Sequence, residues 1–177
     1  MPLTVIQMLW INLIMDTFAA LALATEPPTP KVMEARPRSP EAFIVTPAMG
    51  WNIVLTALVF IGLFIGTVLA WRDGGITPRE LSILFSGFVF LQFWNLLNAR
   101  AFGLGRPLLR KIPHNPVFFW IAAGILIGQV VITQFGGAVF RTVPLGLADW
   151  LLIAAATSSV FWIGELIRFF SSRRKVR

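Results

Sequence analysis

The chain contains no cysteine and only one histidine among its 177 residues. The absence of cysteine excludes disulfide bonds and thiolate metal sites, and it leaves the redox compartment undetermined. We interpret His114 as a solvated loop residue, because it lies between Pro113 and Asn115. The sequence also has no glycine-rich phosphate loop and no histidine close to a plausible nucleophile. The usual chemistry of a soluble enzyme is therefore unsupported.

Charged residues are scarce as well, at 13% against 56% hydrophobic residues, and the mean hydropathy of +0.77 is above that of a soluble domain. The apolar residues form blocks of about 20 residues, the length that crosses a bilayer as a helix. We therefore predict an all-α membrane protein, a bundle of five transmembrane helices. The expected spans are about 3–24, 51–71, 81–99, 116–133 and 147–169.

The net charge of +7 comes from basic residues that lie beside these spans, so the expected partner is the lipid bilayer and not nucleic acid. Twelve of the fifteen Lys and Arg residues belong to the connector 26–47, the loop from residue 100 to 115 and the end of the chain from residue 168. By the positive-inside rule these parts are cytoplasmic, which places the amino terminus outside and the carboxy terminus inside. The basic tail 170–177 is expected to attract anionic lipid.

The first span contains a single ionisable residue, Asp16. A charged Asp at the bilayer centre costs roughly 2.5–3.5 kcal/mol, so it normally faces a partner, a cavity or an ion. Asn12 lies four residues earlier, and on an α-helix this spacing places both side chains on one face, about 6 Å apart along the axis. The pair could bind a cation, or Asp16 could be protonated or hydrogen-bonded to another helix.

A signal peptide is the rival interpretation of this first span, because Ala22, Leu23 and Ala24 resemble a cleavage site. The start of the segment has no basic residue, its apolar run is too long, and Asp16 interrupts it. These features favour a transmembrane helix.

The third span contains three amides at successive i+3 steps, Gln92, Asn95 and Asn98. They cover roughly 120° of the helix and are candidates for interhelical hydrogen bonds or for lining an ion pathway, of which hydrogen bonding alone is favoured. Near the end of the fifth span, Glu165 precedes Arg168 by three residues, a spacing that predicts a local ion pair.

Two GxxxG steps occur in the second and fourth spans. In membrane helices this pattern more often marks close helix packing than a ligand site, and we predict packing for both. The glycines are Gly62, Gly66, Gly124 and Gly128.

Several segments resemble a known family, the P-type calcium-transporting ATPases, especially the plasma-membrane type. The residues LWINLIMDT at 9–17, continuing through ALALATEPP at 20–28, are similar to the sixth transmembrane helix of this family. NLLNAR at 95–100 resembles its eighth helix, NPVF at 115–118 the start of its ninth, and QFGG at 134–137 the following loop. The resemblance covers nearly the whole chain and implies that the five spans are helices six to ten of ten.

The resemblance implies that Asn12 and Asp16 are side-chain ligands of a transported Ca²⁺ ion. Reticulum-type pumps have a Thr and a Glu where this chain has Met15 and Gln92, as in the plasma-membrane type. A thioether is a poor Ca²⁺ donor and an amide lacks the carboxylate charge, so the resemblance implies one ion per cycle. Mn²⁺, Na⁺ and H⁺ stay open as alternative ions.

The parts of a pump that hydrolyse ATP do not occur in these residues. The first five helices, the actuator and nucleotide-binding domains and the Asp-Lys-Thr-Gly phosphorylation motif are missing. We expect the chain alone to have no ATPase site, with ATP and Mg²⁺ bound by the missing domains. It would be a carboxy-terminal fragment, a split gene product or a truncated reading frame, with the amino-terminal portion of a pump as partner and the plasma membrane as location.

A rival class remains open, namely a non-catalytic membrane scaffold or assembly subunit that keeps the helical bundle without transport. In that case Asp16 would pair with a helix of another protein. Even in a pump, Asn12 and Asp16 supply only two or three of the six to eight oxygens that Ca²⁺ takes, so the site in this chain would be incomplete.

Overall fold

The computed structural model of the chain describes residues 3–27, 41, 43, 45–71, 76–102, 108 and 115–174, with the backbone alone at residues 15, 16, 48 and 171–174. The regular secondary structure of these residues is helical. In chain order the helices are α1 (Val5–Asn12), the π-helix η1 (Leu13–Ala19), α2 (Ala20–Ala24), α4 (Pro47–Trp71), α5 (Pro78–Arg100), α6 (Pro116–Phe135), α7 (Gly137–Phe140) and α8 (Leu147–Arg174). The first three follow each other directly, and we call Val5–Ala24 the motif helix.

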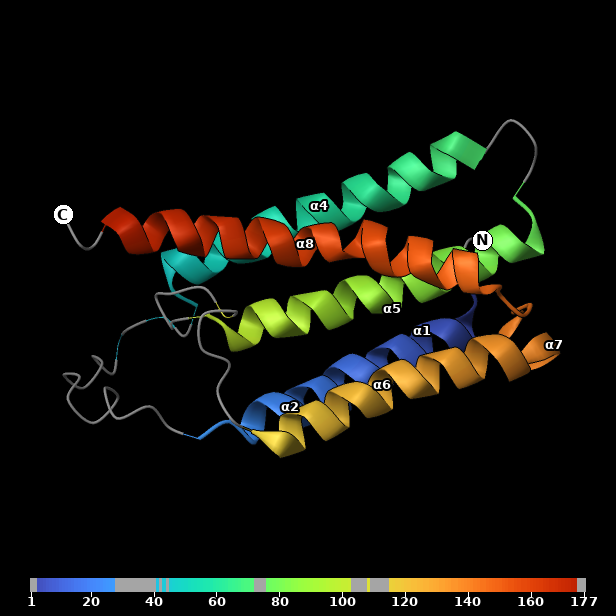
Figure 1. The fold of residues 1–177 in the computed structure, drawn as a ribbon, viewed down its shortest axis with the longest axis horizontal. Helices are drawn as coiled ribbons and strands as arrows, with labels where there is room; N and C mark the ends of the chain where they lie inside the picture. Colours follow the sequence, from blue (N-terminus) through green and yellow to red (C-terminus); the bar gives the residue numbers. More distant parts are fainter. Residues whose placement is uncertain are drawn as a thin grey trace.

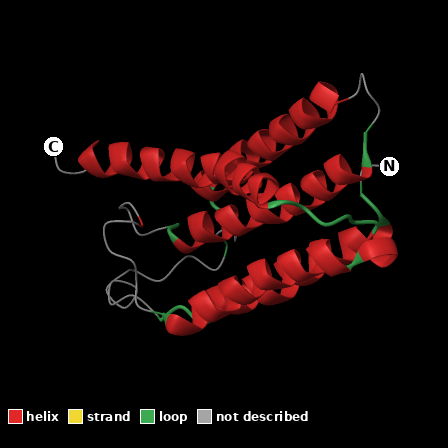
Figure 2. Cartoon of the chain, turned by 45° about the vertical axis from the view of Figure 1, so that its right-hand side comes forward, coloured by secondary structure: helices red, strands yellow, loops and turns green. Residues whose placement is uncertain are grey.

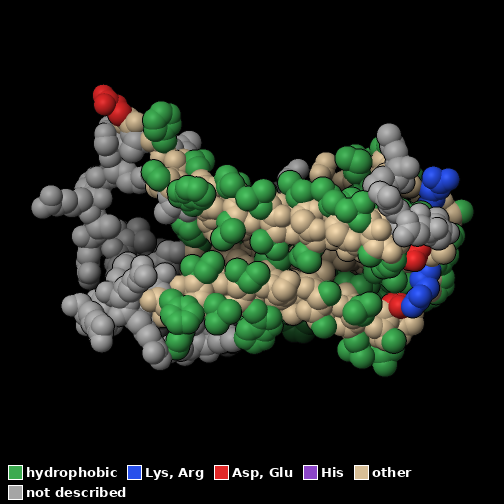
Figure 3. All heavy atoms as spheres, turned by 90° about the horizontal axis from the view of Figure 1, so that it is seen from above, with side chains coloured by type: hydrophobic (Ala, Val, Ile, Leu, Met, Phe, Trp, Pro, Cys, Tyr) green, Lys and Arg blue, Asp and Glu red, His purple; other side chains and the backbone are tan. Residues whose placement is uncertain are grey.

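Five helices of the described residues are long and apolar enough to cross a membrane. They run roughly along one direction (Figure 1), and the cartoon in Figure 2 shows the same elongated bundle from another side. On the face shown in Figure 3, hydrophobic side chains cover the length of the bundle and the charged side chains lie towards its two ends. The prediction of an all-α bundle of five transmembrane helices is confirmed, and the chain is an integral, multi-pass membrane protein.

Local sequence signals explain where several helices begin. Thr4 and Gln7 form a capping box at the start of α1, and Thr77 and Glu80 form another at the start of α5. In each box the Thr hydroxyl accepts from the backbone N–H three residues on, and that residue's side chain accepts from the Thr backbone N–H. Asn115 caps α6 directly before Pro116, and proline suits the first helical turn because its missing N–H needs no partner there.

The main hydrophobic core lies between the motif helix, α5 and α6. Phe85 of α5 and Phe118 of α6 are fully buried in it, and Ala22 of the motif helix is as well. The other buried members are Ile11, Ile14, Ala19, Val89, Leu96, Ala122 and Ile125. This core places the motif helix against two neighbouring helices along its length.

α5 also packs along α8, and polar contacts support this pair. The Trp94 indole donates to the Thr157 hydroxyl at 3.1 Å. Smaller hydrophobic clusters around Phe90 with Ile153, and around Phe161, fill the space between the two helices. The helix α8 continues to Arg174, into the segment that the sequence analysis treats as a basic tail.

The helix α4 is held more loosely than the other spans. None of its described side chains is buried. A cavity of about 460 Å³ lies between α4, α5 and α8, with Gly62 and Gly66 in its wall. Nothing in the described part of the chain lies within 4 Å of a Cβ built on either glycine. The prediction of close packing through this GxxxG step is therefore wrong for the described residues.

The second GxxxG step behaves differently. A Cβ built on Gly128 would lie 3.3 Å from two ring atoms of Trp10, so this glycine lets the motif helix approach α6 closely. Gly124 has nothing within 4 Å of a built Cβ among the described residues. The packing prediction is confirmed for Gly128 and wrong for Gly124, because only Gly128 faces the large Trp10 ring.

Candidate functional site

The motif helix leaves α-helical geometry in its middle, at the segment that contains Asp16. Residues Leu13–Ala19 form a π-helix, between α1 and α2. In a π-helix the backbone hydrogen bonds run from residue i to i+5, which inserts a residue into the turn; such insertions are frequent at functional sites. Neither proline nor glycine occurs in the segment, so no local sequence signal predicts this change.

The π-helix alters the geometry on which the spacing argument for Asn12 and Asp16 relied. Asn12 is the last residue of α1, and its side chain is exposed on the described bundle. Asp16 lies within η1, where the structure describes its backbone. The two residues thus flank and occupy the segment that departs from an α-helix, and their pairing in one site stays a prediction.

The described side chains contain no group of three or more His, Cys, Asp and Glu residues that could hold a metal ion, a search that does not include Asp16. We expect the remaining ligands of an ion site to come from other helices. Asn12 is exposed on the described bundle, and a polar side chain at membrane depth normally faces a helix or a cavity rather than lipid. Its role as a ligand stays a prediction.

Of the three amides of α5, Asn98 is committed to helix packing. Its side chain is buried, donates to the Val160 carbonyl oxygen at 2.9 Å and accepts from Arg168 at 2.8 Å. A side chain at Gly164 of α8 would collide with it. Asn98 therefore ties α5 to α8, while Gln92 and Asn95 are partly exposed and their role as ion-pathway residues stays a prediction.

The ion pair predicted between Glu165 and Arg168 is confirmed, with 2.7 Å between a carboxylate oxygen and a guanidinium nitrogen. The Glu165 carboxylate also accepts from the backbone N–H of Leu108, at 2.9 Å. These contacts fasten the end of α8 to the chain that follows α5. His114 and the basic residues Lys31, Arg36, Arg38, Arg106, Arg110, Lys111, Lys175 and Arg177 lie outside the described residues.

Sequence reasoning missed a buried polar network that holds the first half of the motif helix. The Trp10 indole donates to the Gln129 side-chain oxygen at 2.9 Å, and Gln129 in turn donates to the hydroxyls of Thr133 and Ser86, at 3.1 and 3.3 Å. Gln129, Thr133 and Ser86 are fully buried. The polar side chain of Gln129 inside the apolar run of α6 was the available signal, but nothing in the sequence identified Trp10 as its partner.

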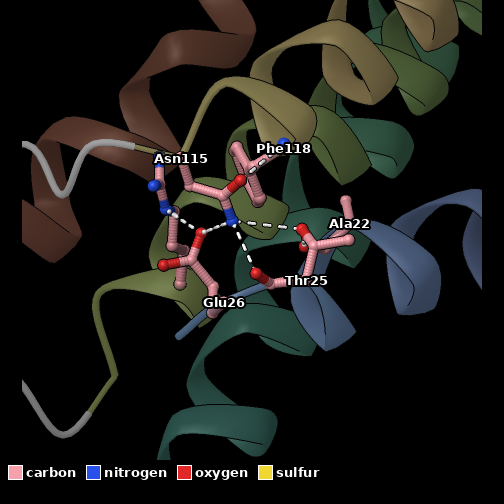
Figure 4. Close-up of polar contacts among 6 residues, drawn as sticks. Ala22, Thr25, Glu26, Asn115 and Phe118 are labelled. Carbon is pink, nitrogen blue, oxygen red and sulfur yellow. Dashed lines mark hydrogen bonds and ion pairs between the residues drawn. The ribbon is translucent and has the colours of Figure 1, made fainter. Parts of the chain in front are cut away.

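A second polar cluster, also missed, holds the other end of the motif helix. Figure 4 shows the Asn115 side chain between Thr25 and Glu26, to which its amide donates at 2.9 to 3.1 Å. Glu26 forms an ion pair of 2.8 Å with Arg100, the last residue of α5. The Arg100 guanidinium carbon lies 4.1 Å from the centre of the Phe118 ring. The end of the motif helix is thus joined to the end of α5 and the start of α6.

Comparisons with known proteins identify the family of this chain. The family described as "Cation transporting ATPase, C-terminus" matches residues 1–170. The chain is 34% identical to the plasma membrane calcium-transporting ATPase mca-1 of Caenorhabditis elegans over 98% of its own length and 15% of that protein's. It is 40% identical to plasma membrane calcium-transporting ATPase 3 of Homo sapiens, over 85% of this chain and 13% of the human protein.

A third relative, the calcium-transporting ATPase PAT1 of Dictyostelium discoideum, is 35% identical over 99% of this chain and 17% of its own length. The chain therefore spans about one seventh of the length of these relatives. The matched family covers almost the whole sequence, and the chain has five helices long and apolar enough to cross a membrane among its described residues. The chain belongs to the family of cation-transporting ATPase C-terminal regions, of the plasma-membrane calcium-transporting type.

Proposed function

We propose that this chain is the transport half of an ATP-driven calcium pump, and that Asn12 and Asp16 supply part of one intramembrane Ca²⁺ site. The observation that carries the proposal is the π-helix Leu13–Ala19, which interrupts the motif helix around Asp16. The similarity to proteins named as calcium-transporting ATPases supplies the choice of ion.

The chemistry of the site follows from the two side chains. Asp16 brings a negative charge to membrane depth, at a cost of roughly 2.5–3.5 kcal/mol that a bound cation would offset. Ca²⁺ takes six to eight oxygen ligands, and Asn12 and Asp16 supply two or three of them. The remaining oxygens come from helices of the amino-terminal portion, towards which the exposed Asn12 side chain would point. With Met15 and Gln92 at the positions of a second site, one ion is carried per cycle.

The energy for transport comes from the amino-terminal portion, in which ATP and Mg²⁺ bind and an aspartyl phosphate forms. Movements of its cytoplasmic domains change the access of the site from one side of the membrane to the other. The basic segments of this chain are cytoplasmic and the amino terminus lies outside the cytoplasm. The tail would interact with anionic lipid of the plasma membrane.

The test joins this chain to the amino-terminal portion of a plasma membrane calcium-transporting ATPase and measures ATP-dependent uptake of ⁴⁵Ca²⁺ into inside-out vesicles. We expect uptake by the joined pump and its loss in Asp16→Asn, which removes the charge and keeps the shape. Thr17→Val, at an exposed neighbour, is the matched control and should transport normally.

Two results would contradict the proposal. If Asp16→Asn transports as well as the unsubstituted pump, Asp16 is not a ligand. If the joined protein assembles but neither binds nor transports Ca²⁺, the chain is a non-catalytic scaffold or assembly subunit of the kind considered above.

A further inference from the structure

The two polar clusters lie on opposite sides of the π-helix. Trp10 comes three residues before η1 begins at Leu13, and Thr25 and Glu26 come directly after α2 ends at Ala24. Both clusters join the motif helix to the same two neighbours, α5 and α6. The segment that contains Asp16 therefore lies between two points at which the motif helix is attached to α5 and α6.

The first attachment combines hydrogen bonding with shape. Because Gln129 is fully buried, its amide must find partners within the protein, and the Trp10 indole satisfies its oxygen. Ser86 and Thr133 satisfy the Gln129 nitrogen and bond each other at 3.0 Å. The Trp10 ring also lies over Gly128, where a built Cβ would be 3.3 Å away. The position of the Trp10 ring is thus fixed by its contact with Gly128 and by its hydrogen bond to Gln129.

The second attachment relies on a buried cation. The Arg100 side chain is only 1% exposed, and its guanidinium group lies over the rings of Phe118 and Phe119, at 4.1 and 5.0 Å from their centres. A cation over an aromatic face is attracted by the negative electrostatic potential of that face. The carboxylate that balances this charge belongs to Glu26, so the buried Arg100 draws the end of the motif helix to α5.

We propose that Gln129 and Arg100 are positioning residues that fix the two ends of the motif helix independently. Gln129 acts through Trp10 on the half that ends at Asn12, and Arg100 acts through Glu26 on the half that begins after the π-helix. Neither residue touches the ion. The proposal concerns the helix itself and would hold whichever cation, or none, binds there.

The test uses the whole chain in lipid nanodiscs with EGTA present, and measures backbone amide exchange along residues 5–26 together with the Trp10 indole ¹⁵N resonance. We compare Gln129→Leu, Trp10→Phe and the double variant. Each single change should speed exchange of residues 5–12 by about five- to tenfold, the range expected for one lost buried hydrogen bond. Because Gln129 acts through Trp10, the double variant should exchange no faster than the faster single variant.

Gln134→Leu is the matched control. Gln134 belongs to the same helix, but within the described residues its amide bonds the backbone of Leu145, donating to the carbonyl oxygen and accepting from the N–H, both at 2.9 Å. This variant should leave exchange of residues 5–12 and the Trp10 indole resonance unchanged. If it has the effect of Gln129→Leu, or if the two single effects multiply in the double variant, Gln129 does not position the helix through Trp10.

The second attachment is tested with two variants, Arg100→Leu and Glu26→Gln. Glu26→Gln removes only the charge of the carboxylate, so it serves as the test if Arg100→Leu fails to fold. Both should speed exchange of residues 20–26, and Glu26→Gln by about threefold because its carboxylate is partly exposed. Residues 5–12 should be unaffected. Equal loosening of both halves by any of these variants would show one rigid helix and overturn the proposal of two independent attachments.

Discussion

The motif helix and α4 are both apolar and long enough to span a membrane, but they are held in opposite ways. The motif helix has polar contacts with α5 and α6 on both sides of its π-helix. α4 lies against α5, where the ring centres of Phe60 and Phe88 are 6.2 Å apart. None of the described side chains of α4 is buried. Figure 1 shows one end of α4 spreading away from the bundle.

This difference shows what hydropathy does and does not determine. α4 is the most apolar of the five spans and the least buried, since apolar side chains gain little from leaving lipid for another helix. The motif helix is less apolar, and buried amides, an indole and an ion pair fix its position. Of these two spans, the one with buried polar contacts is the one that is held on both sides of its length.

The largest effect should come from Arg100. Arg100→Leu leaves the Glu26 carboxylate without its cation, and loss of one partner of a buried pair costs about 3–5 kcal/mol, which we lower to about 2–3 kcal/mol because Glu26 is 23% exposed. Reversible unfolding in mixed detergent micelles, followed by circular dichroism, measures this loss. Trp51→Leu, at a 76% exposed position of α4, should change stability by less than about 0.5 kcal/mol. Equal losses would remove the contrast between the two helices.

The two GxxxG steps give the next effect. Gly128→Leu forces the Trp10 ring away from α6 and should cost about 1–3 kcal/mol, the usual range for overpacking. Gly66→Leu places the same side chain into the cavity beside α4 and should stay within about 0.5 kcal/mol in the chain alone. The same unfolding assay compares the two variants. A larger loss at Gly66 than at Gly128 would mean that α4 is packed more closely than the structure shows.

The smallest effect concerns the start of the motif helix. Gln7 is 2% exposed; it accepts from the Thr4 backbone N–H and donates to the Phe140 carbonyl oxygen at 2.8 Å. Gln7→Leu should therefore cost about 1 kcal/mol, since a cap and a hydrogen bond are lost. Thr67→Val on α4 should cost almost nothing, because among the described residues the Thr67 hydroxyl bonds the Leu63 carbonyl of its own helix. An equal cost for both would indicate that the cap contributes nothing specific.

The number of spans follows from the sequence because apolar length alone sets it, and residues such as Thr77 and Asn115 mark helix starts by local chemistry. The contact between Trp10 and Gln129 joins residues 119 positions apart, which no local pattern records. The π-helix was equally hidden, because its residues suit an α-helix. The identity of Asn12 and Asp16 as candidate ligands came from polarity and resemblance, whereas the π-helix that contains Asp16 came from the structure.

The central claim is that the interrupted segment of the motif helix binds the transported ion. Equilibrium binding of ⁴⁵Ca²⁺ to the pump assembled from this chain and an amino-terminal portion tests it most directly. We predict one Ca²⁺ per pump, lost in Asn12→Ala and in Asp16→Asn and retained in Thr17→Val. Retention of that ion by Asp16→Asn with unchanged affinity would contradict the account.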